Sequence, residues 1–265
     1  MTEPLLDARG IAVSFGGVDA LAGVDLTVAA TSIVGLVGPN GAGKTTLFGV
    51  LSGLLSPRRG RVELAGVDVT GATPQRRARL GLARTFQRLE LFDELTVRDH
   101  LVVARRIREG RDRTLLRDLA GLGRRPSPGE RDAVDALLDL LDLGDVANQP
   151  VPLVPLGTGR IVELARALAT EPRVVLLDEP TSGLDVHETE RVAAALRAAR
   201  ADRGVAFVLV EHDVELVLEL CDDVTVLDFG RVIAHGPPAE IRASAEVQAA
   251  YLGTASSAST AETPR

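Results

Sequence analysis

The sequence is poor in residues that form disulfides, bind soft metals or stack on nucleobases. Its 265 residues include one cysteine, one tyrosine, six phenylalanines and no tryptophan. The single cysteine, Cys221, can form no disulfide within the chain and no all-cysteine zinc site, so a reducing compartment is expected. The few aromatic residues are not interleaved with basic runs, which argues against a stacking platform for single-stranded nucleic acid.

The sequence also lacks a positive net charge and a segment suited to crossing a membrane. The formal charge is −7, so electrostatics does not recruit nucleic acid, and no nucleic-acid partner is predicted. The amino end has no basic region followed by an apolar run, as a signal peptide would have. The longest uncharged stretch, 26–43, contains polar residues and a Gly/Pro loop that do not suit a lipid-exposed helix. We expect a chain that is soluble or reaches a membrane only through a partner.

Lysine is almost absent, and the position of the one lysine is informative. Of the 30 basic residues, 29 are arginine and one is Lys44. The segment 38–45 reads Gly-Pro-Asn-Gly-Ala-Gly-Lys-Thr, which matches the phosphate-loop pattern. An apolar run at 32–37 precedes it and helical periodicity at 46–51 follows, as in a loop between a buried strand and a helix. Backbone N–H groups and the ammonium are therefore predicted to bind phosphates. The predicted nucleotide-binding residues here are Gly38, Pro39, Asn40, Gly41, Ala42, Gly43, Lys44, Thr45 and Thr46, and Thr45 also offers its hydroxyl to Mg²⁺.

A second motif lies far downstream. Residues 173–180 form an apolar strand that ends in two carboxylates, Asp178 and Glu179. A buried strand brings such a pair to the carboxyl edge of a parallel sheet, where ligands bind. There Asp178 suits a Mg²⁺ ligand and Glu179 suits a base that activates water, with a surface acidic pair as the alternative. A regulatory GTPase is excluded, because its guanine-reading Asn-Lys-x-Asp motif needs a second lysine.

With these two motifs the chain resembles the ATP-binding subunits of ATP-binding-cassette (ABC) transporters, from about residue 5 to residue 253. The resemblance implies an α/β fold, namely a P-loop NTPase of the ABC nucleotide-binding type. It would have a RecA-like core, an antiparallel β subdomain and a helical subdomain over about 88–169. Residues 254–260 are small and polar, and 254–265 are expected to form a disordered tail.

Four further positions match functional residues of the family, and the resemblance implies their roles. Phe15 would stack on adenine, with a place in the core as the alternative. Gln87 would contact Mg²⁺ and water, and His212 would contact the γ-phosphate. Asp185 belongs to a loop that crosses the interface between two ATPase subunits and is included among the nucleotide-binding residues. The predicted catalytic residues are thus Glu179, His212 and Gln87, and the predicted metal ligands are Thr45, Gln87 and Asp178.

The chain departs from the family at its signature, Leu-Ser-Gly-Gly-Gln at the start of a helix. Aligned from the helix expected over 163–168, residues 154–158 (Val-Pro-Leu-Gly-Thr) take the place of the signature, and only Gly157 is shared with it. Pro155 stands at the serine position and offers neither a hydroxyl nor an N–H. The helix dipole and the N–H groups after Gly157 still suit an anion. Gly157 is therefore predicted to contact the ATP held by the opposite subunit.

Within the family, the chain is most similar to importers of branched-chain and other hydrophobic amino acids, through residues 81–97, 211–217 and 226–253. The insertion between 97 and 132 resembles the longer of their two ATPase subunits. The resemblance implies hydrolysis of ATP with Mg²⁺ to energise import. It also implies three kinds of partner: a second ATPase subunit, transmembrane permease subunits and a solute-binding protein. The expected location is peripheral, on the cytoplasmic face of the cell membrane.

Two other classes are alternatives. A soluble cassette ATPase acting on nucleic acid or ribosomes usually carries two cassettes, a coiled coil or a zinc insertion, and this chain has one cassette, one cysteine and no heptad run. A non-hydrolysing cassette would lack Lys44, Glu179 or His212. The basic stretch 105–131, with nine arginines against four acids, could face lipid head groups, an acidic partner or only solvent. The solute stays open, because its selection lies in the membrane subunits.

Overall fold

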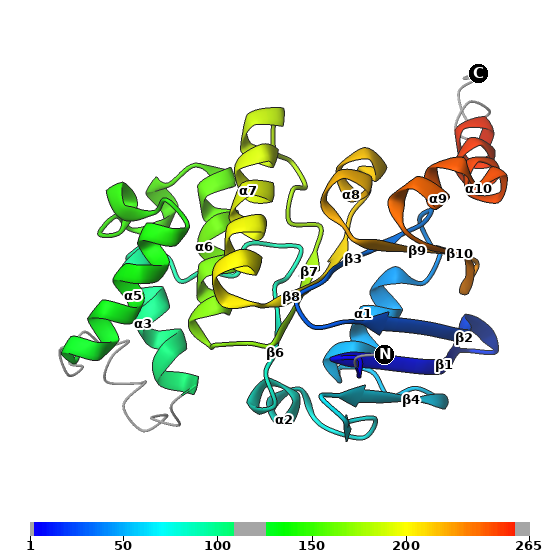
Figure 1. The fold of residues 1–265 in the computed structure, drawn as a ribbon, viewed down its shortest axis with the longest axis horizontal. Coiled ribbons are helices and arrows are strands. Elements are labelled where there is room, and N and C mark those ends of the chain that lie inside the picture. The colour runs from blue at the N-terminus through cyan, green and yellow to red at the C-terminus, as the bar shows by residue number, and fades with distance from the viewer. Residues whose placement is uncertain (1–2, 109–125, 258–265) are drawn as a thin grey trace, which may run out of the picture. The chain divides into compact units, whose positions relative to one another are not determined.

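The computed structural model describes residues 3–108 and 126–257. The chain forms two compact units, which we describe separately: the first comprises residues 1–80 and 206–265, and the second comprises residues 81–205. Figure 1 shows the course of the chain through both. Most of the basic stretch 105–131, namely 109–125, lies outside the described residues.

The first unit contains an antiparallel sheet. Its strand order is β2-β1-β4-β5, with β1 at Leu6–Phe15, β2 at Val18–Val28, β4 at Arg59–Leu64 and β5 at Val67–Asp68. Alternate apolar residues of β1 and β2, such as Ile11 and Val24, are buried, as expected for a sheet with one covered face. The antiparallel β subdomain that the family resemblance implies is confirmed by the pairing of β1 with β2 and β4.

The first unit also contains parallel strands that carry the phosphate loop. The order is β10-β9-β3-β8: β3 (Ile33–Val37) pairs in parallel with β8 (Ala206–Val210) and β9 (Asp223–Asp228), and β10 (Arg231–Gly236) is antiparallel to β9. Every residue of β3 and β8 is buried, which is typical of parallel strands covered on both faces. The helices of this unit are α1 (Lys44–Ser52), α2 (Pro74–Arg79), α8 (Val214–Leu220), α9 (Pro238–Ala243) and α10 (Ala245–Ser257).

Helix α10 differs from the expected tail. It continues to Ser257, so residues 254–257, predicted to be disordered, are helical, while 258–265 lie outside the described residues. Three alanines precede Tyr251 in this helix and Ala255 follows it, and alanine has the highest helix propensity. A small, polar composition was therefore a poor guide to where the helix ends.

The second unit is mainly helical around two short strands. Strand β6 (Leu82–Arg84) pairs in parallel with β7 (Val174–Asp178). In Figure 1, α6 lies beside α3, α5 and α7, and it contacts each of them. The helices are α3 (Val97–Arg108), α5 (Pro128–Leu140), α6 (Leu156–Ala169) and α7 (Val186–Arg203).

Helix α3 begins directly after Thr96, whose side chain caps it. The Thr96 hydroxyl accepts a hydrogen bond from the backbone N–H of Asp99 at 3.1 Å, a standard helix-capping contact. Among the described residues, every helix is too short or too polar to span a bilayer.

Candidate nucleotide-binding and catalytic residues

The phosphate loop joins the end of β3 to the start of α1, as the sequence predicted. Gly38 and Gly43 have φ values of 151° and 106°, a region that L-residues with a Cβ rarely adopt. A Cβ at Gly38 would lie 2.1 Å from the carbonyl oxygen of Leu227, and one at Gly43 would lie 2.7 Å from that of Ala20. Glycine is therefore required at both positions by the fit of the loop against neighbouring backbone.

Lys44 is the first residue of α1 and is only 7% exposed. Its Nζ donates hydrogen bonds to the carbonyl oxygens of Gly38 and Pro39, at 2.6 and 3.0 Å. The ammonium is thus folded back over the loop. Gly43 at the N-cap has no side chain to satisfy the first N–H groups of α1, which suits them to an anion.

Two residues that the sequence analysis did not single out brace this loop and its helix. Arg77 of α2 is fully buried, and its Nη1 donates to the carbonyl oxygens of Val50 and Leu51 at 2.6 and 2.7 Å, at the carboxyl end of α1. Burial lowers its pKa. Tyr251 of α10 is hydrogen-bonded to the backbone of Gly38; burial, opposed by that bond, raises the pKa of its phenol to about 12.

Phe15 and His212 are the other predicted residues of the first unit. Phe15 ends β1 and is 53% exposed, so the alternative of a core position is wrong. The hydroxyl of Ser14 donates to the Asp19 carboxylate at 2.5 Å and closes the hairpin that presents Phe15. His212 is exposed in the loop between β8 and α8, and Asp213 caps α8 by accepting from the N–H of Leu216.

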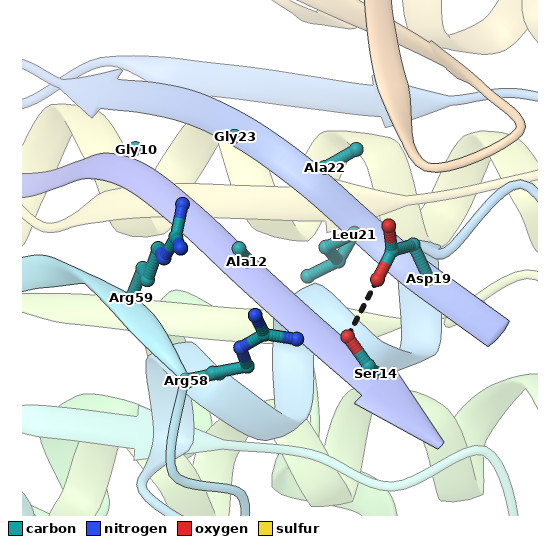
Figure 2. Close-up of a pocket in the computed structure, with 9 residues that line it drawn as sticks. All are labelled: Gly10, Ala12, Ser14, Asp19, Leu21, Ala22, Gly23, Arg58 and Arg59. Atoms are coloured by element: carbon teal, nitrogen blue, oxygen red, sulfur yellow. Dashed lines mark hydrogen bonds between the residues drawn. The ribbon is translucent and has the colours of Figure 1, made fainter. Parts of the chain in front are cut away.

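A pocket of 320 Å³ lies on the antiparallel sheet beside this hairpin, and Figure 2 shows its lining. It is lined by residues of β1 and β2, most of them small, and Arg58 and Arg59 stand at one side. None of the predicted nucleotide-binding residues lines it.

The second unit brings Asp178, Glu179 and Gln87 together. Asp178 ends β7, and its Oδ2 accepts a hydrogen bond from Nη2 of Arg84 at 2.9 Å. The side chains of this ion pair are 12% exposed for Arg84 and 10% for Asp178. The guanidinium also lies over the ring of Phe86, 5.4 Å from its centroid. Sequence reasoning missed Arg84, although the parallel pairing of its strand with 173–178 would have placed it near.

Glu179 is held by Gln87. The side-chain Nε2 of Gln87 donates to Oε2 of Glu179 at 2.8 Å. Glu179 has a φ of 48°, which is unfavourable for a residue with a side chain, and the following Pro180 restricts its backbone further. Backbone strain of this kind is found where the surrounding structure fixes a functional residue.

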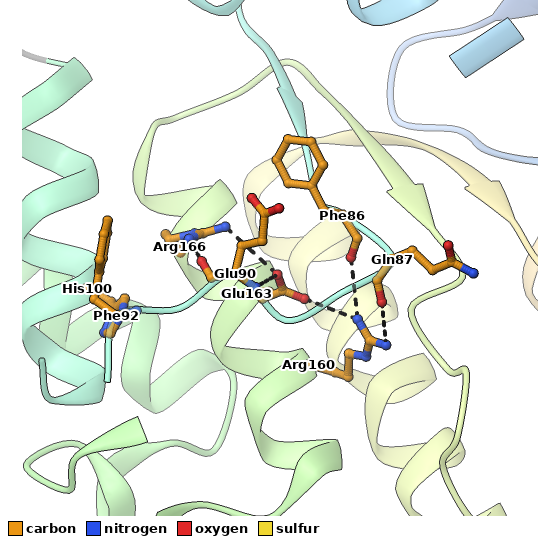
Figure 3. A network of polar contacts seen from close by, with 8 residues as sticks. All are labelled: Phe86, Gln87, Glu90, Phe92, His100, Arg160, Glu163 and Arg166. Atoms are coloured by element: carbon orange, nitrogen blue, oxygen red, sulfur yellow. Dashed lines mark hydrogen bonds and ion pairs between the residues drawn. The ribbon is translucent and has the colours of Figure 1, made fainter. Parts of the chain in front are cut away.

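The segment that carries Gln87 is fixed to α6, the helix that follows the signature, as Figure 3 shows. Arg160 donates to the carbonyl oxygen of Gln87 at 2.9 Å and to that of Phe86 at 3.4 Å. Glu163 accepts from the N–H of Glu90 at 3.2 Å, and burial raises the pKa of its carboxyl. Neither α6 residue was among the predicted site residues, because their partners lie about 73 positions earlier in the chain.

The signature begins α6 with Pro155 as N-cap. The N–H of Gly157 donates to Oε1 of Glu188 at 3.2 Å. A Cβ at Gly157 would lie 2.9 Å from that of Glu188, so glycine is needed there for this contact. Asp185 caps α7 and forms a reciprocal capping box with Glu188. Gly157 and Asp185 thus make contacts at the starts of α6 and α7, and their contact with nucleotide stays a prediction.

Comparison with known families agrees with these motifs. The family described as "ABC transporter" matches residues 21–182. A second family, described as "Branched-chain amino acid ATP-binding cassette transporter", matches residues 231–256, which include β10, α9 and most of α10.

Similar proteins cover nearly the whole chain. It is 37% identical to the high-affinity branched-chain amino acid transport ATP-binding protein BraF of Pseudomonas aeruginosa, over 96% of this chain and 100% of BraF. It is 36% identical to LivG of Escherichia coli, of the same description, over 96% of this chain and 100% of LivG.

Solved structures show the same fold. A crystal structure of the ADP conformation of an ATP-binding cassette of an ABC transporter has a TM-score of 0.81 and 28% identity, over 95% of this chain and 100% of that one. The structure of cbiO1 from Clostridium perfringens, part of the ABC transporter complex cbiONQ, has a TM-score of 0.79 and 25% identity, over 96% of this chain and 100% of that one.

Proposed function

This chain belongs to the ABC transporter family, and we propose that it hydrolyses ATP to drive import of branched-chain or other hydrophobic amino acids. As a family member it is an ABC-type ATPase and the ATP-binding subunit of a transporter complex. The observation that carries the substrate class is the similarity to BraF and LivG along nearly the whole chain, together with the match of residues 231–256.

The nucleotide would be held by the phosphate loop. Backbone N–H groups of the loop and of the first turn of α1 bind the phosphates, and the Lys44 ammonium exchanges its two carbonyl contacts for phosphate oxygens. Phe15, exposed at the end of β1, offers its ring to adenine. Each step uses a group whose position in the first unit is described above.

The predicted metal ligands supply the kind of oxygen donors that Mg²⁺ prefers. The Thr45 hydroxyl, the Gln87 amide and the Asp178 carboxylate are hard ligands of the kind Mg²⁺ takes together with phosphates. Asp178 has one oxygen bonded to Arg84, which leaves its other oxygen for the ion. When bound, Mg²⁺ neutralises charge on the phosphates.

The Glu179 carboxylate would accept a proton from the attacking water, because it is a strong acceptor aimed by the Gln87 amide. Gln87 orients the base and the water, and the exposed His212 contacts the γ-phosphate. Gly157 and Asp185 would face the ATP of a second ATPase subunit. We further propose permease subunits and a solute-binding protein as partners, with the chain peripheral on the cytoplasmic face of the cell membrane.

The test is reconstitution. The chain is produced with its partner ATPase and permeases, placed in vesicles, and uptake of labelled leucine is followed with ATP on the chain's side. ATP-dependent uptake is expected, and Lys44→Ala should abolish it and weaken nucleotide binding, because no other lysine can replace the charge. Uptake of a sugar but not of leucine would contradict the substrate class, and full activity of Lys44→Ala would contradict the assignment of the site.

A further inference from the structure

We propose that Arg84 is a positioning residue for the metal site: it holds Oδ2 of Asp178 and thereby keeps the other carboxylate oxygen directed at Mg²⁺. The proposal rests on the proposed function, in which Asp178 serves the metal. Neither the motifs nor the family resemblance singled out Arg84.

The first step is the register of the two strands. Strands β6 and β7 are parallel, and Arg84 stands opposite Leu176, two residues before Asp178. A long side chain at the end of β6 can therefore reach along its neighbour to the carboxylate that ends β7. The 2.9 Å contact between Nη2 and Oδ2 is the result.

The second step is how firmly the guanidinium is held. It is largely buried and stacks over Phe86, whose carbonyl oxygen accepts from Arg160 on α6. Arginine presents planar donors whose geometry survives such stacking, unlike the single ammonium of lysine. Arg84 is thus a fixed donor, so it fixes the rotamer of Asp178.

The third step is what a fixed carboxylate does for Mg²⁺. The ion demands near-ideal octahedral geometry, so a ligand that rotates binds it poorly. Hydrogen bonds from an outer group to a ligating carboxylate are worth about 10- to 100-fold in metal affinity. Arg84 and Asp178 are neutral as a pair, so the pair adds little attraction for a cation. The contribution of Arg84 is therefore orientation rather than charge.

The experiment measures metal dependence apart from hydrolysis. Binding of a fluorescent ATP analogue to the assembled complex is titrated with Mg²⁺, and its affinity is also measured in EDTA. Arg84→Met should raise the Mg²⁺ concentration at half-effect about tenfold or more, with metal-free affinity unchanged. Arg84→Lys should fall between, and it carries the test if Arg84→Met does not fold. Arg105→Met, which removes the Arg105–Glu171 pair at 3.0 Å elsewhere in this unit, is the matched control and should behave as wild type.

Asp178→Asn separates this proposal from the proposed function. If Asp178→Asn leaves the Mg²⁺ midpoint unchanged, the metal role of Asp178 fails. The role of Arg84 is overturned if Asp178→Asn raises the Mg²⁺ midpoint and the Arg84 variants leave it unchanged or lower it. It is also overturned if the Arg84 variants weaken nucleotide binding in EDTA as much as they weaken it with Mg²⁺. In the double variant Arg84→Met with Asp178→Asn, the shift should equal that of Asp178→Asn alone, because both act through one carboxylate.

Discussion

Glu179 occupies a backbone conformation that costs free energy. A positive φ at a residue with a side chain costs about 1–3 kcal/mol, and it persists only where the surroundings impose it. Here the following proline restricts the backbone further without favouring this conformation, so the fold imposes it, and Gln87 holds the carboxylate. Such a placement is useful for a base that must meet one water molecule, because little motion is left to restrict during the reaction.

At the same residue scale, Glu179→Gln should retain ATP binding and lower turnover about 10²- to 10⁴-fold. The amide is isosteric and its oxygen can still accept from Gln87, but it cannot take up the proton of water. Turnover and nucleotide affinity are measured on the assembled complex, with Glu190→Gln on the exposed part of α7 as control. If Glu179→Gln turned over like wild type, the base would be another residue, and His212 would be tested next.

At the scale of elements, α3 and α5 are joined by a buried ion pair. Arg106 Nε donates to Glu130 at 2.9 Å, and the two side chains are 7% and 5% exposed. Burial alone would raise the pKa of Glu130, but hydrogen bonds from Ser127 and Arg106 outweigh it and lower the pKa to about 2. The unfolded chain has the ordinary, higher value, so the folded state binds fewer protons at this site.

This pKa shift makes stability depend on pH. The contribution of Glu130 is complete above its unfolded pKa of about 4.5 and is lost as the pH falls towards 2. Glu130→Gln should lower the free energy of unfolding by about 3 kcal/mol at pH 7, and by clearly less at pH 3.5. Urea unfolding at both pH values measures this. As a control, Glu190→Gln, which breaks the exposed Arg197–Glu190 pair, should change the free energy of unfolding by less than about 1 kcal/mol. If Glu130→Gln lowered the free energy of unfolding equally at both pH values, the lowered pKa of Glu130 would be contradicted.

The carboxyl-terminal helix gives another prediction at this scale. Tyr251 of α10 is hydrogen-bonded to Gly38, the first glycine of the phosphate loop. Tyr251→Phe removes one neutral hydrogen bond, so we expect ATP affinity to fall about 2- to 10-fold with little change in kcat. Gln248→Ala, which removes an exposed contact on the same helix, should leave affinity unchanged. Equal affinities for Tyr251→Phe and wild type would show that α10 does not brace the loop.

How far the sequence could predict the site depends on chain separation. The phosphate loop was predictable, because strand, loop and helix lie within about twenty residues. Glycines and a lysine at that spacing between a strand and a helix are typical of phosphate binding. The contacts of Arg84 with Asp178 and of Arg160 with Gln87 join positions 94 and 73 apart, and no local pattern encodes them. The bond from Gly157 to Glu188 depends on how α6 and α7 pack, which periodicity does not give.

At the scale of the whole molecule, the chain combines an intact phosphate loop with a poor signature. In ABC dimers the signature of one subunit meets the ATP bound by the other, so its defects would be felt in the partner's site. Pro155 offers no hydroxyl there, and the Gly157 N–H is already bonded to a carboxylate. A negative charge at that helix terminus would repel a phosphate as well as occupy its donor.

We therefore expect unequal sites when this chain pairs with an ATPase subunit that has a fuller signature. The site built on Lys44 should carry most hydrolysis, and the partner's phosphate loop should turn over slowly. One charge-assisted hydrogen bond of about 1.5–3 kcal/mol, lost in the transition state, corresponds to roughly tenfold to over a hundredfold in rate.

To test this asymmetry, the phosphate-loop lysine of each subunit is mutated in turn within the assembled transporter, and ATPase activity is compared. In a complex that retains only the partner's phosphate-loop lysine, Pro155→Ser, alone and with Glu188→Gln, should raise turnover, because these changes restore a hydroxyl and remove the competing charge. Equal losses from the two lysine variants would refute the asymmetry, and so would signature variants that leave the partner's site as slow as before.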